Sequence, residues 1–124
     1  MTEVGIVIVS HSKWIAQGLV DLISEVAKDI VLTYVGGTED GGIGTSFEQV
    51  QTVVEANKAE KILAFFDLGS ARMNLELVAD FSDKDIIINN VPIVEGAYTA
   101  AALLQADADL VTIQEQLKEL EIKK

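Results

Sequence analysis

Residues 4–13 read Val-Gly-Ile-Val-Ile-Val-Ser-His-Ser-Lys, and this stretch decides the fold. Its near-continuous run of valine and isoleucine is typical of a strand that is buried on both faces of a parallel sheet. Ser12 is suited to cap a helix, and apolar residues follow it at helical spacing: Ile15, Leu19, Leu22, Ile23 and Val26. The stretch therefore predicts a strand that leads directly into a helix, with His11, the single histidine of the chain, at the junction.

The same alternation of strand and helix patterns continues along the chain. Three further apolar runs predict strands, at residues 30–35, 61–66 and 86–88. Three further helical patterns alternate with them, at residues 46–54, 70–78 and 93–104, and a fourth follows at residues 109–120. This order predicts an α/β fold: a doubly wound, mainly parallel four-stranded sheet in the order 2-1-3-4, with helices on both faces.

Individual residues indicate where these helices begin and how they pack. Ser46 with Gln49 forms a capping-box pattern, and Ser70 and Asp109 are each suited to cap the helix that follows them. Residues 93–104 are rich in alanine and glycine, which predicts close packing against a neighbour. A contact in a dimer is one way to use such a helix, and ordinary packing on the sheet is the other.

Length and composition narrow the range of functions. The 124 residues predict one domain, and 49% of them are hydrophobic, enough for a substantial core. Nine basic residues against twenty acidic ones give a net charge of −11, which argues against nucleic acid or an anionic membrane as a partner. A net charge of −11 does suit docking against a basic partner protein. The absence of cysteine excludes disulfides and thiolate metal sites, and we expect no metal. Without a signal-peptide pattern or a membrane-length apolar run, a cytoplasmic protein is expected.

The expected strand order places two reactive side chains next to each other. His11 follows the first strand and Asp67 follows the third, and these strands are neighbours in the order 2-1-3-4. A carboxylate that accepts from one imidazole nitrogen fixes the tautomer and leaves the other nitrogen free as a nucleophile or base. The helix starts near Ser12 and Ser70 offer backbone N–H groups suited to a phosphoryl group. The residues thus indicate a phosphohistidine or an acid–base site.

Plainer interpretations of the same residues stay open at this point. A lone histidine at a helix start is structural about as often as functional, and an aspartate after a strand is more often a turn or cap residue. Residues 36–45 contain five glycines but lack the Lys-Ser/Thr ending of a nucleotide-binding P-loop. Lys13 and Arg72 could help to hold phosphate, although exposed basic residues are usually only solvated.

Four motifs extend the comparison to a known family. They are Val9-Ser10-His11-Ser12, then Gly36-Gly37-Thr38 with Ile43-Gly44-Thr45-Ser46, then Asp67-Leu68-Gly69-Ser70-Ala71 with Met73-Asn74, and finally Asn90-Val91-Pro92-Ile93-Val94-Glu95-Gly96-Ala97. In this order, over nearly the whole chain, they resemble the phosphotransferase subunits of PEP-dependent dihydroxyacetone kinase, within the mannose-type enzyme IIA superfamily.

The resemblance implies a function and a set of partners. It implies a homodimeric carrier, here a single domain over residues 1–124 without fused HPr or enzyme I domains. His11 would accept a phosphoryl group from phospho-HPr and pass it to ADP held on the nucleotide-binding subunit of the kinase. The carrier itself would hold no cofactor, because the phosphoryl group comes from PEP through HPr. Asp67 would orient His11. The remaining residues that the resemblance places in the site loops are Ser12, Gly37, Thr38, Gly69 and Ser70.

Two other functions remain as alternatives. A mannose-type enzyme IIA would feed a sugar-permease IIB component, and such proteins resemble this chain except that they typically carry His-Gly after the first strand and Gly-Gly-(Thr/Ser)-Pro after Asp-Leu. His11-Ser12 and Gly69-Ser70-Ala71 favour the dihydroxyacetone branch instead. A non-catalytic flavodoxin-like binding module is the third possibility. A receiver domain would need an acidic pair at Ser10-His11-Ser12, and a flavodoxin would need a phosphate loop without a histidine.

Overall fold

The computed structural model describes residues 3–124, and its strands form a parallel sheet in the order β2-β1-β3-β4. The strands are β1 (Val4–Ser10), β2 (Val31–Gly36), β3 (Lys61–Phe66) and β4 (Asp85–Asn89). The helices are α1 (Lys13–Ser24), α2 (Phe47–Ala56), α3 (Gly69–Phe81), α4 (Ile93–Gln105) and α5 (Leu110–Lys118). The predicted fold class and strand order are confirmed.

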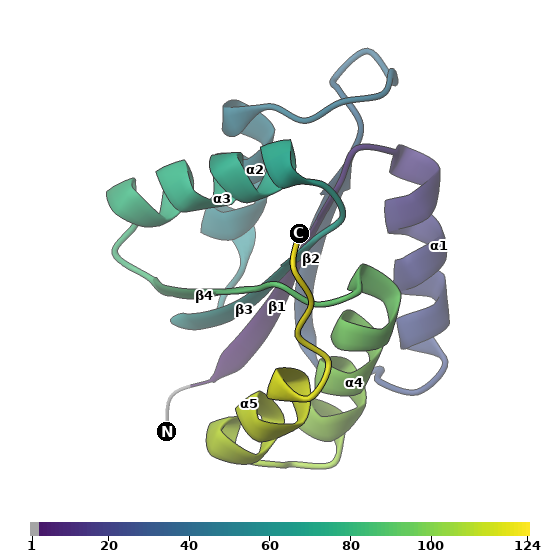
Figure 1. Ribbon diagram of the computed structural model, residues 1–124, viewed down its shortest axis with the longest axis vertical. Coiled ribbons are helices and arrows are strands. Elements are labelled where there is room, and N and C mark those ends of the chain that lie inside the picture. The colour runs from purple at the N-terminus through teal and green to yellow at the C-terminus, as the bar shows by residue number, and fades with distance from the viewer. Residues whose placement is uncertain (1–2) are drawn as a thin grey trace.

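Helices cover both faces of the sheet, as Figure 1 shows. α1, α4 and α5 pack on the face that receives Ile6 and Ile8 of β1, whereas α2 and α3 pack on the face that receives Val7 and Val9. Successive side chains of a strand point to opposite faces, so a central strand with a helix layer on each side needs apolar residues throughout. The continuous Val/Ile run of β1 meets this requirement, and residues 6–9 are fully buried.

Most helix starts follow the sequence pattern, and one does not. The side chains of Ser12, Ser46 and Asp109 cap α1, α2 and α5 by accepting from the backbone N–H three residues later. The prediction that Ser70 caps α3 is wrong. The N-cap residue is Leu68, whose side chain cannot accept a hydrogen bond, and α3 begins at Gly69. Ser70 lies in the first turn, where its hydroxyl is free to contact another residue.

The apolar stripe predicted for α1 is wider than its buried face. Ala16, Leu19 and Ile23 are buried, whereas Ile15 and Leu22 are 48% and 45% exposed. Ala16 takes the inward position because the start of α1 lies close to the end of β2. A Cβ at Gly36 would lie 2.4 Å from the Ser12 carbonyl oxygen and 2.7 Å from the Ala16 Cβ. The contact between the end of β2 and the start of α1 therefore requires small residues on both sides.

The small residues of α4 pack against other elements of the same chain. Gly96, Ala97, Ala100 and Ala101 are its buried residues, and the helix contacts the sheet, α1 and α5. A Cβ at Gly96 would lie 2.2 Å from a methyl carbon of Val91, so only glycine fits there. The predicted close packing is confirmed, and packing on the sheet accounts for it.

Candidate active site

The site lies at the carboxyl ends of β1 and β3, the upper edge of the sheet in Figure 1. Val9 of β1 is paired with Phe66 of β3 in the parallel register. The next residues of each strand extend beyond the ladder together, which brings His11 and Asp67 into contact. The predicted pairing of these two residues is therefore confirmed by the geometry.

Asp67 receives four hydrogen bonds. One carboxylate oxygen, Oδ2, accepts from the Ser10 hydroxyl at 2.8 Å and from the His11 backbone N–H at 2.9 Å. The other, Oδ1, lies 2.8 Å from His11 Nδ1 and accepts from the Leu68 backbone N–H at 2.7 Å. Burial raises the pKa of Asp67, but these hydrogen bonds lower it more, and the pKa lies below its usual value. The carboxylate is thus ionised and fixed in place.

The imidazole of His11 is held between Asp67 and Ser70. An ionised carboxylate can only accept, so Nδ1 carries the ring proton and its N–H donates a hydrogen bond to Asp67. Nε2 is then unprotonated, and its lone pair accepts from the Ser70 hydroxyl at 2.5 Å. The His11 side chain is 15% exposed. This arrangement presents one nucleophilic nitrogen at the surface with its lone pair fixed in direction.

The glycine-rich loop between β2 and α2 is tied to the same point of the backbone. Gly44 donates its N–H to the His11 carbonyl oxygen at 2.8 Å, and Gly37 donates to that of Ser10 at 3.1 Å. Both glycines have positive φ values, 145° and 77°, which residues with a side chain rarely adopt. The loop therefore fixes the position of the residues around His11.

The other predicted site residues differ in how close they come to His11. Thr38 points into its own turn, where its hydroxyl contacts Asp40 and accepts from the Gly42 N–H. Ser12 caps α1, and Gly69 begins α3. α1 begins two residues after His11, and the first turn of α3 contacts the imidazole through Ser70. The first N–H groups of a helix have no partner within it. They are suited to bind anionic oxygens.

The two basic residues considered as phosphate ligands have other contacts. The Lys13 ammonium lies 4.9 Å from the centre of the Trp14 ring. Arg72 pairs with Glu76 at 3.9 Å and donates to the Lys124 carbonyl oxygen at 3.5 Å. Both cations are thus engaged in contacts away from the imidazole, whereas the Ser70 hydroxyl contacts it directly.

Sequence reasoning identified Ser10 only as part of a motif and missed Lys124. Ser10 is 1% exposed and donates to Asp67, and the available signal was its place as the polar end of an apolar strand. Lys124, whose ammonium binds the Phe66 and Val91 carbonyl oxygens, has no sequence pattern that would identify it. Its position depends on how the last residues fold back over the sheet.

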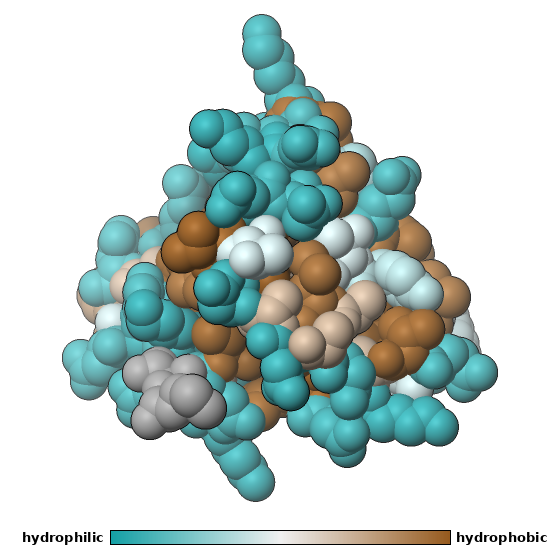
Figure 2. All heavy atoms as spheres, turned by 90° about the horizontal axis from the view of Figure 1, so that it is seen from below, coloured by the Kyte–Doolittle hydropathy of each residue, from teal (hydrophilic) through white to brown (hydrophobic). Residues whose placement is uncertain are grey.

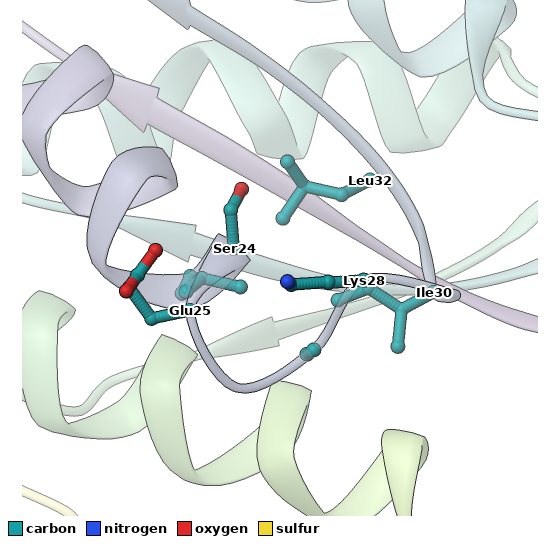
Figure 3. Close-up of a pocket in the computed structure, with 7 residues that line it drawn as sticks. Ser24, Glu25, Lys28, Ile30 and Leu32 are labelled. Atoms are coloured by element: carbon teal, nitrogen blue, oxygen red, sulfur yellow. The ribbon is translucent and has the colours of Figure 1, made fainter.

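Two hollows of the surface lie at the opposite edge, where the strands begin. The larger, of about 860 Å³, lies between the start of β2 and the turn before α5, and Figure 2 looks onto this edge. The smaller, of about 450 Å³, is lined by the turn after α1 and the start of β2; Figure 3 shows Glu25, Lys28 and Leu32 around it. Both are wide open and far from His11. Within residues 3–124, no cluster of histidine and carboxylate side chains resembles a metal site, and no helix is long and apolar enough to cross a membrane.

A family model described as the fructose IIA component of the PTS system matches residues 5–114, a range that contains both His11 and Asp67. The chain belongs to the EIIA-man family. Among solved structures, an EIIA component from Streptococcus agalactiae superposes on this EIIA-man chain with a TM-score of 0.69 at 15% identity, covering 94% of this chain and 90% of that one. That likeness shows the fold.

Two relatives connect this EIIA-man chain to the dihydroxyacetone branch. It is 59% identical to the phosphotransferase subunit DhaM of PTS-dependent dihydroxyacetone kinase from Lactococcus lactis, over 97% of this chain and 98% of that protein. It is 52% identical to the phosphoryl donor subunit DhaM of PEP-dependent dihydroxyacetone kinase 1 from Listeria innocua, over 96% of each. The resemblance that the four motifs indicated is confirmed.

Proposed function

We propose that this chain is the phosphoryl donor subunit of a PEP-dependent dihydroxyacetone kinase. The observation that carries the proposal is the His11 imidazole, held at Nδ1 by Asp67 while the unprotonated Nε2 contacts the hydroxyl of the exposed Ser70. The 59% identity to a DhaM subunit over nearly its full length supports this branch of the EIIA-man family. In this proposal the donor is phospho-HPr, and the acceptor is ADP held on the nucleotide-binding subunit.

The transfer follows from the orientation of the ring. The Nε2 lone pair forms a bond to phosphorus while the bond between phosphorus and the donor histidine breaks. The ring keeps its Nδ1 proton, so phosphorylated His11 carries a positive charge that the Asp67 carboxylate balances. In the second step the Nε2–phosphorus bond breaks as a terminal oxygen of ADP attacks, and ATP forms on the partner. No other bond of this chain changes.

The phosphoryl oxygens need hydrogen-bond donors, and the site offers several. Ser70 occupies the position next to Nε2 and can rotate to donate its hydroxyl proton to a phosphoryl oxygen. The free N–H groups at the starts of α1, after Ser12, and of α3, at Gly69 and Ser70, add the positive ends of two helices. Gly37 and Thr38 support the loop behind them. Positioning and charge stabilisation are what phosphoryl transfer requires.

The surface around His11 suits protein partners. Four large apolar side chains from three segments surround the site and are strongly exposed, at 74%, 78%, 60% and 64%: Trp14, Ile43, Leu68 and Met73. Apolar side chains with a polar surround are typical of protein interfaces. The net charge of −11 suits partners with a basic docking surface. HPr and the ADP-loaded subunit would use this face in turn, with the carrier acting as a homodimer in the cytoplasm.

Intact-mass measurement tests the proposal. The protein is incubated with PEP, enzyme I and HPr, and we expect one phosphoryl group on the His11 peptide that is lost in acid. Addition of the ADP-loaded kinase subunit should remove it and produce ATP. His11→Ala, which removes the single histidine, is the negative control, and Lys13→Ala serves as a matched neighbouring variant that still accepts phosphate.

The outcomes separate the alternatives. Phosphate that forms but passes only to a sugar-permease IIB component would make the chain a transporter IIA protein. An unphosphorylated His11 under conditions that phosphorylate a known EIIA protein would remove the carrier function altogether.

A further inference from the structure

The last residues of the chain run across the carboxyl end of the sheet, next to the site. Figure 1 shows this segment running upward from α5, between α3 and α4, toward the carboxyl ends of the strands. Its path is fixed by hydrogen bonds to two neighbouring elements. Ile122 donates its N–H to the Asn90 carbonyl oxygen at 2.9 Å, and Arg72 of α3 donates to the Lys124 carbonyl oxygen at 3.5 Å.

The side chain of Lys124 points inward from this segment. Its ammonium donates to the carbonyl oxygens of Phe66 and Val91, both at 2.6 Å, and lies 4.0 Å from the centre of the Phe66 ring. Holding a long side chain in one conformation costs entropy, so an ordinary surface lysine stays in solvent. Two charge-assisted hydrogen bonds and a cation–π contact offset this cost here.

The position of the ammonium connects it to the catalytic pair. Phe66 is the last residue of β3, and Asp67 follows it directly. Burial lowers the pKa of Lys124, while the negative charge of Asp67 raises it again, and the net result lies below the usual value. A Coulomb interaction is mutual, so the ammonium also stabilises the ionised form of Asp67.

The charges around this point show why a cation is useful. Asp67 is ionised, and a phosphoryl group on His11 would add further negative charge within the same few residues. Arg72 faces the segment through its backbone contact but also pairs with Glu76, which offsets its charge. The Lys124 ammonium donates to neutral carbonyl groups, and within residues 3–124 it forms no ion pair with a side-chain carboxylate that would offset its charge.

We propose that Lys124 is a positioning residue of the phosphocarrier site. It holds the end of β3 from which Asp67 extends, and its positive charge offsets the negative charges that Asp67 and a phosphoryl group on His11 place side by side. The part of this proposal that concerns phosphorylated His11 rests on the proposed function. The effect on Asp67 does not.

Three substitutions separate charge from hydrogen bonding. Lys124→Met removes both, Lys124→Gln retains a donor without charge, and Lys124→Arg retains both. Lys123→Met is the matched control, because its side chain is exposed on the neighbouring residue. The titration of the Asp67 carboxyl is followed by ¹³C NMR and assigned through its loss in Asp67→Asn. Phosphoryl acceptance from phospho-HPr is measured in parallel.

We expect Lys124→Met and Lys124→Gln to raise the Asp67 titration midpoint by about 0.5 to 1 pH unit, the effect of one nearby charge at the surface of a protein. Phosphoryl acceptance should fall by about 3-fold to 10-fold, because the incoming phosphoryl group loses the same nearby cation and one pH unit is equivalent to a factor of ten. Lys124→Arg should restore both, and Lys123→Met should change neither.

Two results would overturn the proposal. One is an unchanged Asp67 midpoint in Lys124→Met, which would make Lys124 a simple anchor of the last residues. The other is a shifted midpoint that Lys124→Arg fails to restore, which would assign the effect to altered packing. If wild-type protein accepts no phosphate at all while the midpoint shifts as expected, the proposed function fails and the positioning of Asp67 by Lys124 stands.

Discussion

At the scale of single residues, the site depends on how many donors one carboxylate can satisfy. Asp67 accepts four hydrogen bonds, and three of the donors belong to Ser10 and His11. The carboxylate therefore positions both the backbone and the ring of the histidine. An aspartate that served only as a turn residue would have no reason to hold the imidazole.

Asp67→Ala should change the tautomer of His11. With Asp67 present, we expect the neutral ring to carry its proton on Nδ1, because the carboxylate can only accept there. Without it, the proton should move to Nε2 in most molecules and block the nucleophilic lone pair. ¹⁵N NMR measures this directly, since the chain contains one histidine and so one pair of ring nitrogens. Phosphoryl acceptance should fall by about 100-fold or more.

Ser70→Ala is the control for this measurement, because it removes the contact at Nε2 and leaves Asp67 in place. Its ring should keep the proton on Nδ1. If the Asp67→Ala protein also keeps it there, the backbone around His11, and not the carboxylate, sets the tautomer.

Ser10→Ala tests the buried end of β1. Ser10 is 1% exposed, donates to Asp67 and accepts from the Ser12 N–H at 3.1 Å. Its removal leaves a partly buried carboxylate short of one donor, so we expect a loss of about 1 kcal/mol or more in the free energy of unfolding, measured with urea. Ser12→Ala removes a 3.4 Å cap contact at an exposed position and should cost less, about 0.5 kcal/mol. Equal costs would mean that the Ser10 hydroxyl has no special role.

At the scale of elements, close backbone approach positions α1 next to β2. A Cβ at Gly36 would lie 2.7 Å from the Lys13 Cα and 2.4 Å from the Ser12 carbonyl oxygen. Both are backbone atoms, so relief requires α1 to move. Gly36→Ala should therefore lower the free energy of unfolding by about 2 kcal/mol or more. Displacement of α1 would also disturb His11, and its NMR signals should shift.

Gly18→Ala is the matched control. Gly18 lies within α1, and an added Cβ would meet nothing within 4 Å. Alanine in the interior of an exposed helix stabilises by about 0.5–1 kcal/mol relative to glycine. The two substitutions should therefore have opposite signs in the same urea measurement. A neutral Gly36→Ala would show that α1 can shift without cost.

The elements also show which parts of the fold sequence patterns can predict. β3 was predicted to the residue because a buried strand needs an unbroken apolar run, and 61–66 is bounded by polar residues. The start of α3 was not, because Ser70 has the chemistry of a cap but its hydroxyl is used by His11, 59 residues away in the sequence. A local pattern cannot reveal that a tertiary contact takes the same group. Lys124 is the stronger case, since its partners, Phe66 and Val91, belong to two other parts of the chain.

At the scale of the whole molecule, the acidic composition obscures the contribution of any one carboxylate. With a net charge of −11, acidification reduces repulsion over the entire surface and thereby stabilises the folded state. Protonation of Asp67 acts in the opposite direction, because its folded-state pKa is lowered by the hydrogen bonds that it accepts. Comparing wild type with Asp67→Asn at each pH removes the shared surface term and isolates this residue.

The sign of the expected pH dependence follows from the lowered pKa. A carboxylate whose folded pKa is below its unfolded value, about 3.9 for aspartate, contributes stability that is present above that value and is lost as the pH falls through the folded pKa. The difference in unfolding free energy between wild type and Asp67→Asn should thus be constant from about pH 6 upward and shrink steadily below about pH 4. Urea unfolding at pH 7, 5, 4 and 3 measures it, as conditions chosen around that window. Asp109→Asn serves as the control, because the pKa of Asp109 is also lowered, by its cap contacts with Thr112, but Asp109 is exposed. The difference in unfolding free energy between wild type and Asp109→Asn should therefore be smaller and should shrink in the same acid range. A difference for Asp67→Asn that stays the same down to pH 3 would mean that the charge of Asp67 contributes nothing to folding, and that the four hydrogen bonds serve the histidine alone.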